Sequence, residues 1–185
     1  MIGGLTVMKK CMVLTCMFFI FTVSLYAQDI TIIQTTDLHS HFLGFSPNID
    51  YTPATINDDN TVGGWARIAT VINDTKKSRK NPVLVLDSGD FLMGSLFHLL
   101  CREEAFELRL MKTMGYDCIT LGNHEFDRTS SFLAKFRDGL SFPVLCSNIE
   151  TKADPDLKGK FVPYHIFEIQ GERIGIIGLI TPEVI

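Results

Sequence analysis

Short apolar runs rich in β-branched residues recur along the chain and alternate with longer amphipathic segments. Each run is almost continuous in Val, Ile, Leu or Thr, a pattern typical of strands that are buried on both faces. Four such runs come first, and they predict strands at 29–36, 83–87, 117–121 and 143–147. Two more strands, at 164–170 and 173–180, are predicted around a turn at Gly171 and Glu172.

Helices are predicted between the first four strands, at 65–80, 95–114 and 129–139. In the first, Trp65, Ile68 and Ile72 fall on one face, while lysines gather near the C-terminus, where the helix dipole favours cations. Gly115 is a natural stop for the second helix. Segment 44–64 instead holds prolines, Asn and Asp residues and paired glycines, which predicts an irregular loop.

The alternation of strand and helix predicts an α/β fold with a largely parallel sheet. In such sheets the carboxyl ends of the strands lie along one edge, where ligands bind. Each of the first three strands runs into titratable or metal-competent residues, in segments 37–41, 87–90 and 122–127. We therefore expect these three segments to converge.

The first 27 residues differ in character from the rest. Lys9 and Lys10 precede an apolar run of 15 residues from Cys11 to Leu25, and Ala27 offers a small residue at a cleavage point. This is the pattern of a secretory signal peptide. A retained membrane anchor is the disfavoured alternative, because a spanning helix needs about 20 apolar residues. We expect residues 1–27 to be removed and residues 28–185 to form one exported domain, periplasmic or extracellular.

The net charge and the cysteine spacing argue against several classes of function. Without residues 1–27 the chain keeps 15 basic and 21 acidic residues, a net charge of −6. This balance gives no bulk attraction to a nucleic-acid polymer or an anionic membrane. Cys101, Cys118 and Cys146 lack the spacing of a metal knuckle, so buried thiols are expected, with one disulfide as the alternative.

The first candidate for metal chemistry is Asp37-x-His39. Two residues separated by one position on an extended backbone point to the same side of the chain. A carboxylate and an imidazole then hold the same cation, a pair that suits Zn, Mn or Fe. The motif is weak by itself, since a strand-end turn with a surface histidine gives the same pattern.

The second candidate is Gly89-Asp90, with Gly94 four positions later. Glycine before the carboxylate lets the backbone turn sharply after the strand, and Gly94 permits close approach before the next element. One carboxylate can bridge two cations roughly 3.5–4 Å apart. Asp87 competes for this role, but as the last strand residue it is more simply a hydrogen-bonded turn former, so Asp90 is favoured.

The third candidate is Gly122-Asn123-His124-Glu125, followed by Asp127. Asn123 offers a neutral oxygen ligand. His124, next to it, is better placed to face a substrate than to bind the same metal. A nearby carboxylate, Asp127 or Glu125, would hold the imidazole and stabilise its protonated form, as acid–base catalysis requires.

Together these motifs resemble the calcineurin-like metallophosphoesterases, and in detail the branch of 5′-nucleotidases and UDP-sugar hydrolases. Three further stretches carry the closer resemblance, and they are Thr36–Phe42, Gly63-Gly64-Trp65-Ala66-Arg67 and Gly175–Glu183. The resemblance covers nearly all of residues 29–185. It implies a metallophosphatase-type β-sandwich core flanked by helices.

The resemblance also implies a site and a reaction. Asp37 and His39 would bind a first divalent metal ion, Asp90 would bridge both metals, and Asn123 would bind the second and contact substrate. His124, paired with Asp127, would stabilise the phosphoryl group or its leaving oxygen. A hydroxide activated by two metals such as Zn or Mn would attack phosphorus, and the substrate would be a nucleotide or another phosphate ester.

The chain departs from the family pattern at its C-terminus. The family completes its metal site with histidines in the second half of the catalytic domain, and none of that pattern precedes Ile185. Of the remaining histidines, His41 is the one near the ligand pair, while His98 and His165 read as structural. We therefore expect a C-terminally truncated domain that needs the missing half of the enzyme, and little activity from these residues alone.

Several alternatives share these motifs. A 2′,3′-cyclic nucleotide phosphodiesterase or a hydrolase of sulfur oxidation would have the same N-terminal half, since the specificity residues lie further on. A degenerate member that binds nucleotide or metal without chemistry is a second class. A structural α/β protein with strand-end turn formers is a third.

Overall fold

The computed structural model describes residues 28–44, 61–102, 106–138 and 140–182. The predicted signal peptide at 1–27 and most of the predicted loop at 44–64 lie outside the described residues.

A four-stranded parallel sheet forms the centre of the molecule. Its strands are β1 (Thr31–Thr35), β2 (Val83–Asp87), β3 (Cys118–Thr120) and β4 (Val144–Leu145), in the order β1-β2-β3-β4. The pairing aligns Thr35 with Asp87 and Asp87 with Ile119, so the first three strands end at nearly the same level. The α/β prediction is thus confirmed, with strands shorter than the apolar runs that predicted them.

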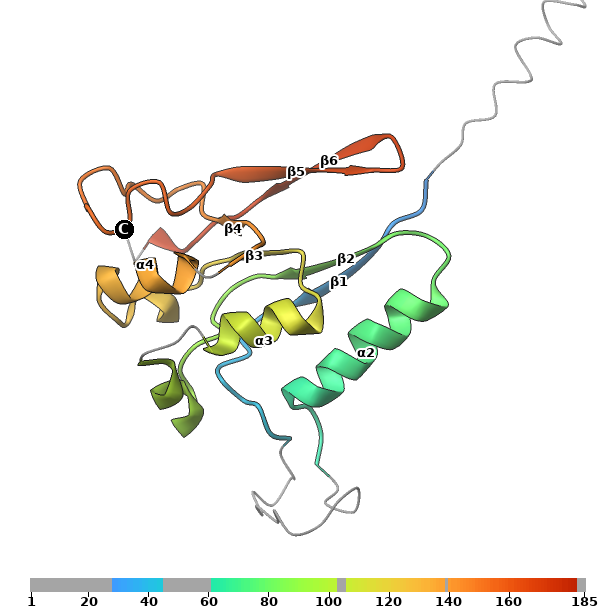
Figure 1. Cartoon of the computed structure of the whole chain (residues 1–185), viewed down its shortest axis with the longest axis horizontal. Coiled ribbons are helices and arrows are strands. Elements are labelled where there is room, and N and C mark those ends of the chain that lie inside the picture. Colours follow the sequence, from blue (N-terminus) through green and yellow to red (C-terminus); the bar gives the residue numbers. More distant parts are fainter. Residues whose placement is uncertain (1–27, 45–60, 103–105, 139, 183–185) are drawn as a thin grey trace, which may run out of the picture.

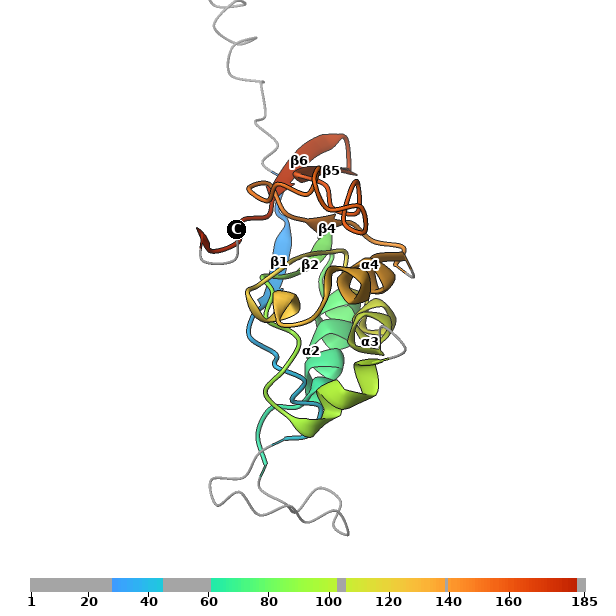
Figure 2. The ribbon, with the colours of Figure 1, turned by 90° about the vertical axis from the view of Figure 1, so that its left-hand side faces the viewer.

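Three helices cover one face of this sheet, as Figures 1 and 2 show. They are α2 (Trp65–Ser78), α3 (Phe106–Met114) and α4 (Ser130–Asp138). Trp65 and Ile72 of α2 are buried in the core beneath the sheet, together with Val85 and Ile119 from the strands. The predicted apolar face of the first helix is therefore the face that packs.

The prediction of a single helix over residues 95–114 is wrong. The structure has a 3-10 helix, η1 (Leu96–Arg102), followed by the separate helix α3. Leu96 is 81% exposed, whereas Leu108 and Met111 of α3 are buried. Leu96 therefore does not continue the buried stripe of α3.

An antiparallel hairpin lies on the other face of the sheet. It consists of β5 (Tyr164–Ile169) and β6 (Glu172–Ile177), and in Figure 1 it runs above β1 and β2, opposite α2 and α3. Just after β6, a Cβ on Gly178 would lie 2.5 Å from Leu145 Cβ, so only glycine allows this close approach. The central sheet thus has helices on one side and the separate two-stranded sheet of β5 and β6 on the other.

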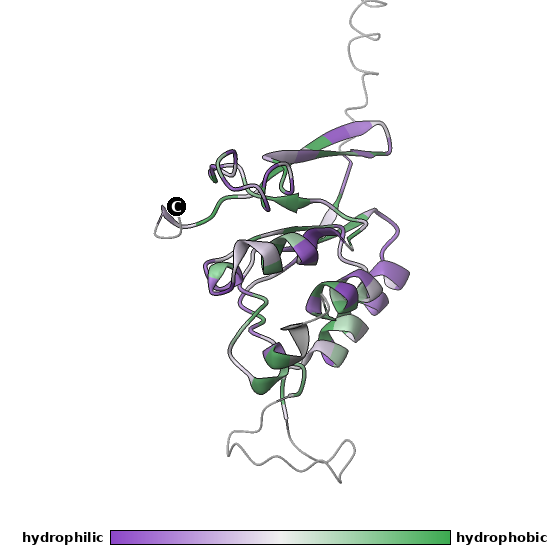
Figure 3. Ribbon diagram, turned by 60° about the vertical axis from the view of Figure 1, so that its left-hand side comes forward, coloured by the Kyte–Doolittle hydropathy of each residue, from purple (hydrophilic) through white to green (hydrophobic). Residues whose placement is uncertain are grey.

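Hydropathy follows these layers. Figure 3 shows the central strands as mainly hydrophobic and the turn of the hairpin as hydrophilic. Ile32 and Ile177 are hydrophobic strand residues that are nevertheless exposed to solvent, by 55% and 68%. Among the described residues no helix is both long and apolar enough to span a membrane.

Two of the three cysteines outside the N-terminal segment are buried free thiols. Burial raises the pKa of the Cys118 thiol to about 12 and that of the Cys146 thiol to about 11. Both are therefore protonated and unreactive at neutral pH. The side chain of Cys101 lies outside the described residues.

Candidate metal centre and catalytic histidine

Three chain segments meet beyond the carboxyl ends of β1, β2 and β3. The first two are joined by backbone hydrogen bonds, from Asp37 N–H to Gly89 O at 3.0 Å and from His39 N–H to Asp90 O at 3.0 Å. The third is joined to the second where His124 N–H donates to Asp90 Oδ1 at 2.9 Å. Asp90 thus lies between the other two segments.

Asp37, His39 and Asp90 form a cluster that suits a divalent cation. Each offers one ligand atom, and these atoms all lie within 4.8 Å of one another. His39 Nε2 lies 3.6 Å from Asp37 Oδ1, while His39 Nδ1 lies 3.1 Å from Leu92 O. An Nδ1–H that donates to this carbonyl leaves Nε2 unprotonated for a metal. Two carboxylates and an imidazole match the preferences of Mn, Fe and Zn.

The backbone conformation that brings Asp37 and His39 together differs from the one predicted from the sequence. The backbone is not extended there, because Asp37, His39 and Ser40 have φ values of 54°, 44° and 51°. Asp90 has φ 57°. Such left-handed conformations are unfavourable for non-glycine residues and need support from their surroundings. The expectation of an extended pair is wrong, although the two side chains do lie together.

Two glycines allow the second and third segments to approach. A Cβ on Gly89 would lie 2.2 Å from Gly122 N, and a Cβ on Gly122 would lie 2.2 Å from Asp90 Oδ1. Gly89 also has φ 98°. Any larger residue at either position would push Asp90 away from the cluster.

Asp87 and Asp90 have different surroundings. Asp87 is 3% exposed, accepts a hydrogen bond from Thr35 Oγ1 at 2.5 Å, and accepts another from Gly89 N–H at 2.9 Å. Burial is the main reason that its pKa rises to about 7. Asp87 is therefore a buried support for the turn, and the geometry favours Asp90 as the ligand.

Asn123 begins the 3-10 helix η2 (His124–Phe126), and its side chain does not cap that helix. It is half-buried. The amide is thus not used by the local secondary structure, which leaves its oxygen available to a ligand.

His124 is paired with Asp127, three residues later. His124 Nδ1 lies 2.6 Å from Asp127 Oδ2, and this hydrogen bond is the main cause of the raised pKa of His124. The ring centroid of His124 lies 5.0 Å from that of His39. The structure therefore places a histidine with a stabilised protonated form beside the metal-competent cluster.

Glu125 does not hold His124, which was the alternative to Asp127. Its side chain is fully buried, and its carboxylate accepts hydrogen bonds from three backbone N–H groups. Oε2 accepts from Gly122 and Asp90 at 2.7 and 2.9 Å, and Oε1 accepts from Leu92 at 3.0 Å. Glu125 thus ties the segment after β2 to the segment after β3.

The other histidines lie outside the cluster. His41 is closest, with its ring centroid 6.5 Å from that of His39 and its Nδ1 3.3 Å from Leu38 O. His98 belongs to η1, and His165 belongs to β5, where its ring packs against Phe167.

Residues 30–182 match the family described as calcineurin-like phosphoesterase. The chain belongs to the calcineurin-like phosphoesterase family. A probable 5′-nucleotidase from Treponema pallidum is 40% identical over 153 residues. The NAD 5′-nucleotidase of Haemophilus influenzae is 34% identical over 155 residues.

The chain is also similar to a solved structure. The 5′-nucleotidase precursor from Thermus thermophilus has a TM-score of 0.71 and 35% identity, and the match covers 84% of this chain and 29% of that one. The match to the Treponema relative covers 83% of this chain and 25% of the relative, and the match to the Haemophilus relative covers 84% and 25%. The chain therefore spans about a quarter of the length of these curated relatives.

Replacing Glu125 by glutamine should destabilise the protein. Glutamine has one oxygen where glutamate has two, so the amide NH₂ would face at least one buried N–H donor. We expect the free energy of unfolding to fall by about 1–3 kcal/mol. Urea titration followed by the fluorescence of Trp65, the single tryptophan, measures it. The exposed Glu150→Gln is the control, and equal stability of both variants would contradict the interpretation.

Asp87 should make the stability of the metal-free protein depend on pH. Its pKa in the folded state, about 7, is above the ordinary value of 3.8, so the folded state binds more protons between these pH values. Its contribution is present below about pH 4 and is lost as the pH rises towards 7, by at most about 1.4 kcal/mol per pH unit. Asp87→Asn should make the urea midpoint less dependent on pH in this range. An unchanged pH dependence would show that Asp87 is not the group.

Proposed function

We propose that this chain is the metal-binding and acid–base part of an exported phosphoester hydrolase that acts on nucleotides, in the manner of a 5′-nucleotidase. The observation that carries the proposal is the Asp37–His39–Asp90 cluster with the His124–Asp127 pair beside it. The names of the relatives support the substrate class.

Two divalent ions such as Zn or Mn fit the donors available. Asp37 and His39 would hold one ion, Asp90 would bridge to a second, and Asn123 would contribute its amide oxygen there. When bound, such ions lower the pKa of a nucleophilic water and neutralise charge on the phosphoryl oxygens.

The chain's own residues handle the proton and the orientation. Asp127 accepts the Nδ1–H of His124 and stabilises the imidazolium. His124 then donates its Nε2 proton to the leaving oxygen, and Asn123 is positioned to contact the phosphoryl group. Glu125 and the two close glycines fix the spacing between these groups.

Phosphate release from AMP by the complete gene product tests the proposal. We expect activity that chelation by EDTA abolishes and that Mn²⁺ or Zn²⁺ restores, and we expect AMP to be preferred over 2′,3′-cyclic AMP. Metal-dependent hydrolysis of the cyclic nucleotide alone would replace the nucleotidase assignment with the phosphodiesterase. If neither AMP nor 2′,3′-cyclic AMP is hydrolysed in a metal-dependent way, the proposal is overturned.

The 185-residue chain by itself should release phosphate slowly. Two Asp, one His and one Asn are too few protein ligands to hold two cations tightly. Two bound metal ions per chain, measured by metal analysis, together with rapid phosphate release would contradict this expectation.

The N-terminal segment completes the proposal. Residues 1–27 would direct export and be cleaved after Ala27, so mass spectrometry of the secreted protein should find Gln28 at the N-terminus. An intact N-terminus on protein in the cytosol would contradict export.

A further inference from the structure

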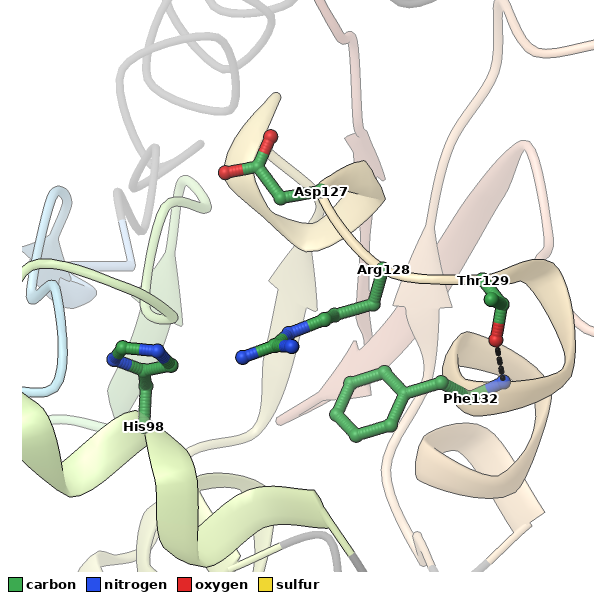
Figure 4. A pocket seen from close by; sticks show the side chains of 5 residues that line it. All are labelled: His98, Asp127, Arg128, Thr129 and Phe132. Atoms are coloured by element: carbon green, nitrogen blue, oxygen red, sulfur yellow. Dashed lines mark hydrogen bonds between the residues drawn. The ribbon is translucent and has the colours of Figure 1, made fainter.

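An open cavity of about 530 Å³ lies beside the His124–Asp127 pair. Figure 4 shows its lining, which consists of His98, Asp127, Arg128, Thr129 and Phe132. Asp127 is the only one of these residues in the candidate catalytic set. Because Asp127 holds His124, the cavity adjoins the place where a leaving group would depart.

Arg128 supplies the charge in this cavity. Its side chain points towards His98, as Figure 4 shows. Within the part of the chain that the structure describes, Arg128 has no ion pair and no side-chain hydrogen bond. Arg128 is half-buried, so its cation is partly removed from water without a partner.

Among the described residues that line the cavity, the negative charge belongs to Asp127. Its carboxylate binds His124 and turns away from Arg128. His98 Nδ1 is engaged by Ser95 O, which leaves Nε2 for a ligand. Thr129 Oγ1 accepts a hydrogen bond from Phe132 N–H, so the first turn of α4, with its positive dipole end, borders the cavity. Among the described residues of the lining, Arg128 is therefore the charged group that is left for a ligand.

We propose that this cavity is a subsite for an oxyanion of the leaving group, such as the inner phosphate of a nucleoside diphosphate, held by Arg128 with His98. The planar guanidinium matches a phosphate with two N–H donors. The proposal rests on the proposed function, because it places the scissile phosphoryl group at the Asp37–His39–Asp90 cluster.

With a nucleoside diphosphate, the reaction balances as follows. Water adds to the terminal phosphorus, and the bond from that phosphorus to the bridging oxygen breaks. The bridging oxygen takes the proton from His124, and the nucleoside monophosphate leaves with its phosphate on Arg128. Inorganic phosphate is the other product.

Kinetics of the complete gene product with ADP and AMP test the subsite. AMP has no second phosphate, so its KM should change less than about twofold in Arg128→Ala. The KM for ADP should rise roughly tenfold, with little change in kcat. Arg128→Lys should recover only part of the loss, because lysine lacks the planar pair of donors. Lys135→Ala, which removes an exposed charge from the helix α4 that follows Arg128, is the matched control.

An equal effect of Arg128→Ala on both substrates, or no effect on either, would overturn the subsite while leaving the proposed function intact. Hydrolysis of neither substrate by the wild-type protein would instead overturn the proposed function. In that case, phosphate binding to the metal-free 185-residue chain still tests whether the cavity holds an oxyanion. Titration with inorganic phosphate should shift the Arg128 Nε–Hε NMR signal in a saturable way. The titration should reach roughly 50 mM phosphate, so that a site with a dissociation constant in that range is still detected. A signal that does not move up to this concentration would exclude an oxyanion site.

Discussion

Asp90→Asn is expected to abolish measurable binding of Mn²⁺ or Zn²⁺ to the 185-residue chain. Asp90 is a member of the three-residue cluster, and it is also the residue that His124 N–H contacts. Asparagine keeps the oxygen that accepts this hydrogen bond but removes the negative charge. Loss of supporting residues alone typically costs about 10–100-fold in metal affinity, so loss of a charged ligand should cost on the order of 100-fold or more.

Isothermal titration calorimetry on the wild-type chain and the variant measures this effect. Asp138→Asn is the matched control, because it removes the same charge from an exposed side chain of α4 that pairs with Lys160. The control should bind metal as the wild type does. Equal metal affinity of Asp90→Asn and the wild type would remove Asp90 from the site.

His124→Ala should lower the kcat of the complete gene product for AMP by about 10²–10⁴-fold, the range that acid–base catalysis contributes. Metal affinity should stay within about twofold, because the metal-competent cluster does not include His124. His165→Ala, on β5, serves as the control for loss of a half-buried histidine. A kcat for His124→Ala equal to that of the control would exclude His124 from the chemistry.

Asp127→Asn should move the pH dependence rather than remove activity entirely. The hydrogen bond from Asp127 raises the pKa of His124, so the neutral amide should let that pKa fall. The protonated form of His124 would then be lost at lower pH, and the alkaline limb of the kcat profile should shift to lower pH. A limb at the wild-type position would show that another group controls it.

The sequence predicted the fold and the meeting of the three segments well, for a simple physical reason. Buried parallel strands have nearly continuous apolar runs, and their carboxyl ends share one edge, so the positions of Asp37, Asp90 and His124 follow from strand order. For His124 the sequence left Asp127 and Glu125 as alternative partners. The 3-10 helix η2 favours Asp127, because three residues make one turn of such a helix.

The parts that failed depend on long-range packing or local strain. The left-handed backbone at Asp37 and His39 could not be predicted, because neither residue is a glycine. The sequence also placed Leu96 in one long helix, but its side chain is exposed and does not reach the core. The three N–H donors of Glu125 come from two segments that are distant in sequence, so only the folded chain brings them to one carboxylate.

The most direct test of the metal centre is the anomalous diffraction of zinc in a crystal of the chain grown with Zn²⁺. We expect a strong peak about 2.0–2.2 Å from oxygen or nitrogen atoms of Asp37, His39 and Asp90, with any second peak bridged by Asp90 and near Asn123. Full-occupancy zinc elsewhere on the surface, with no peak among these three side chains, would contradict the account.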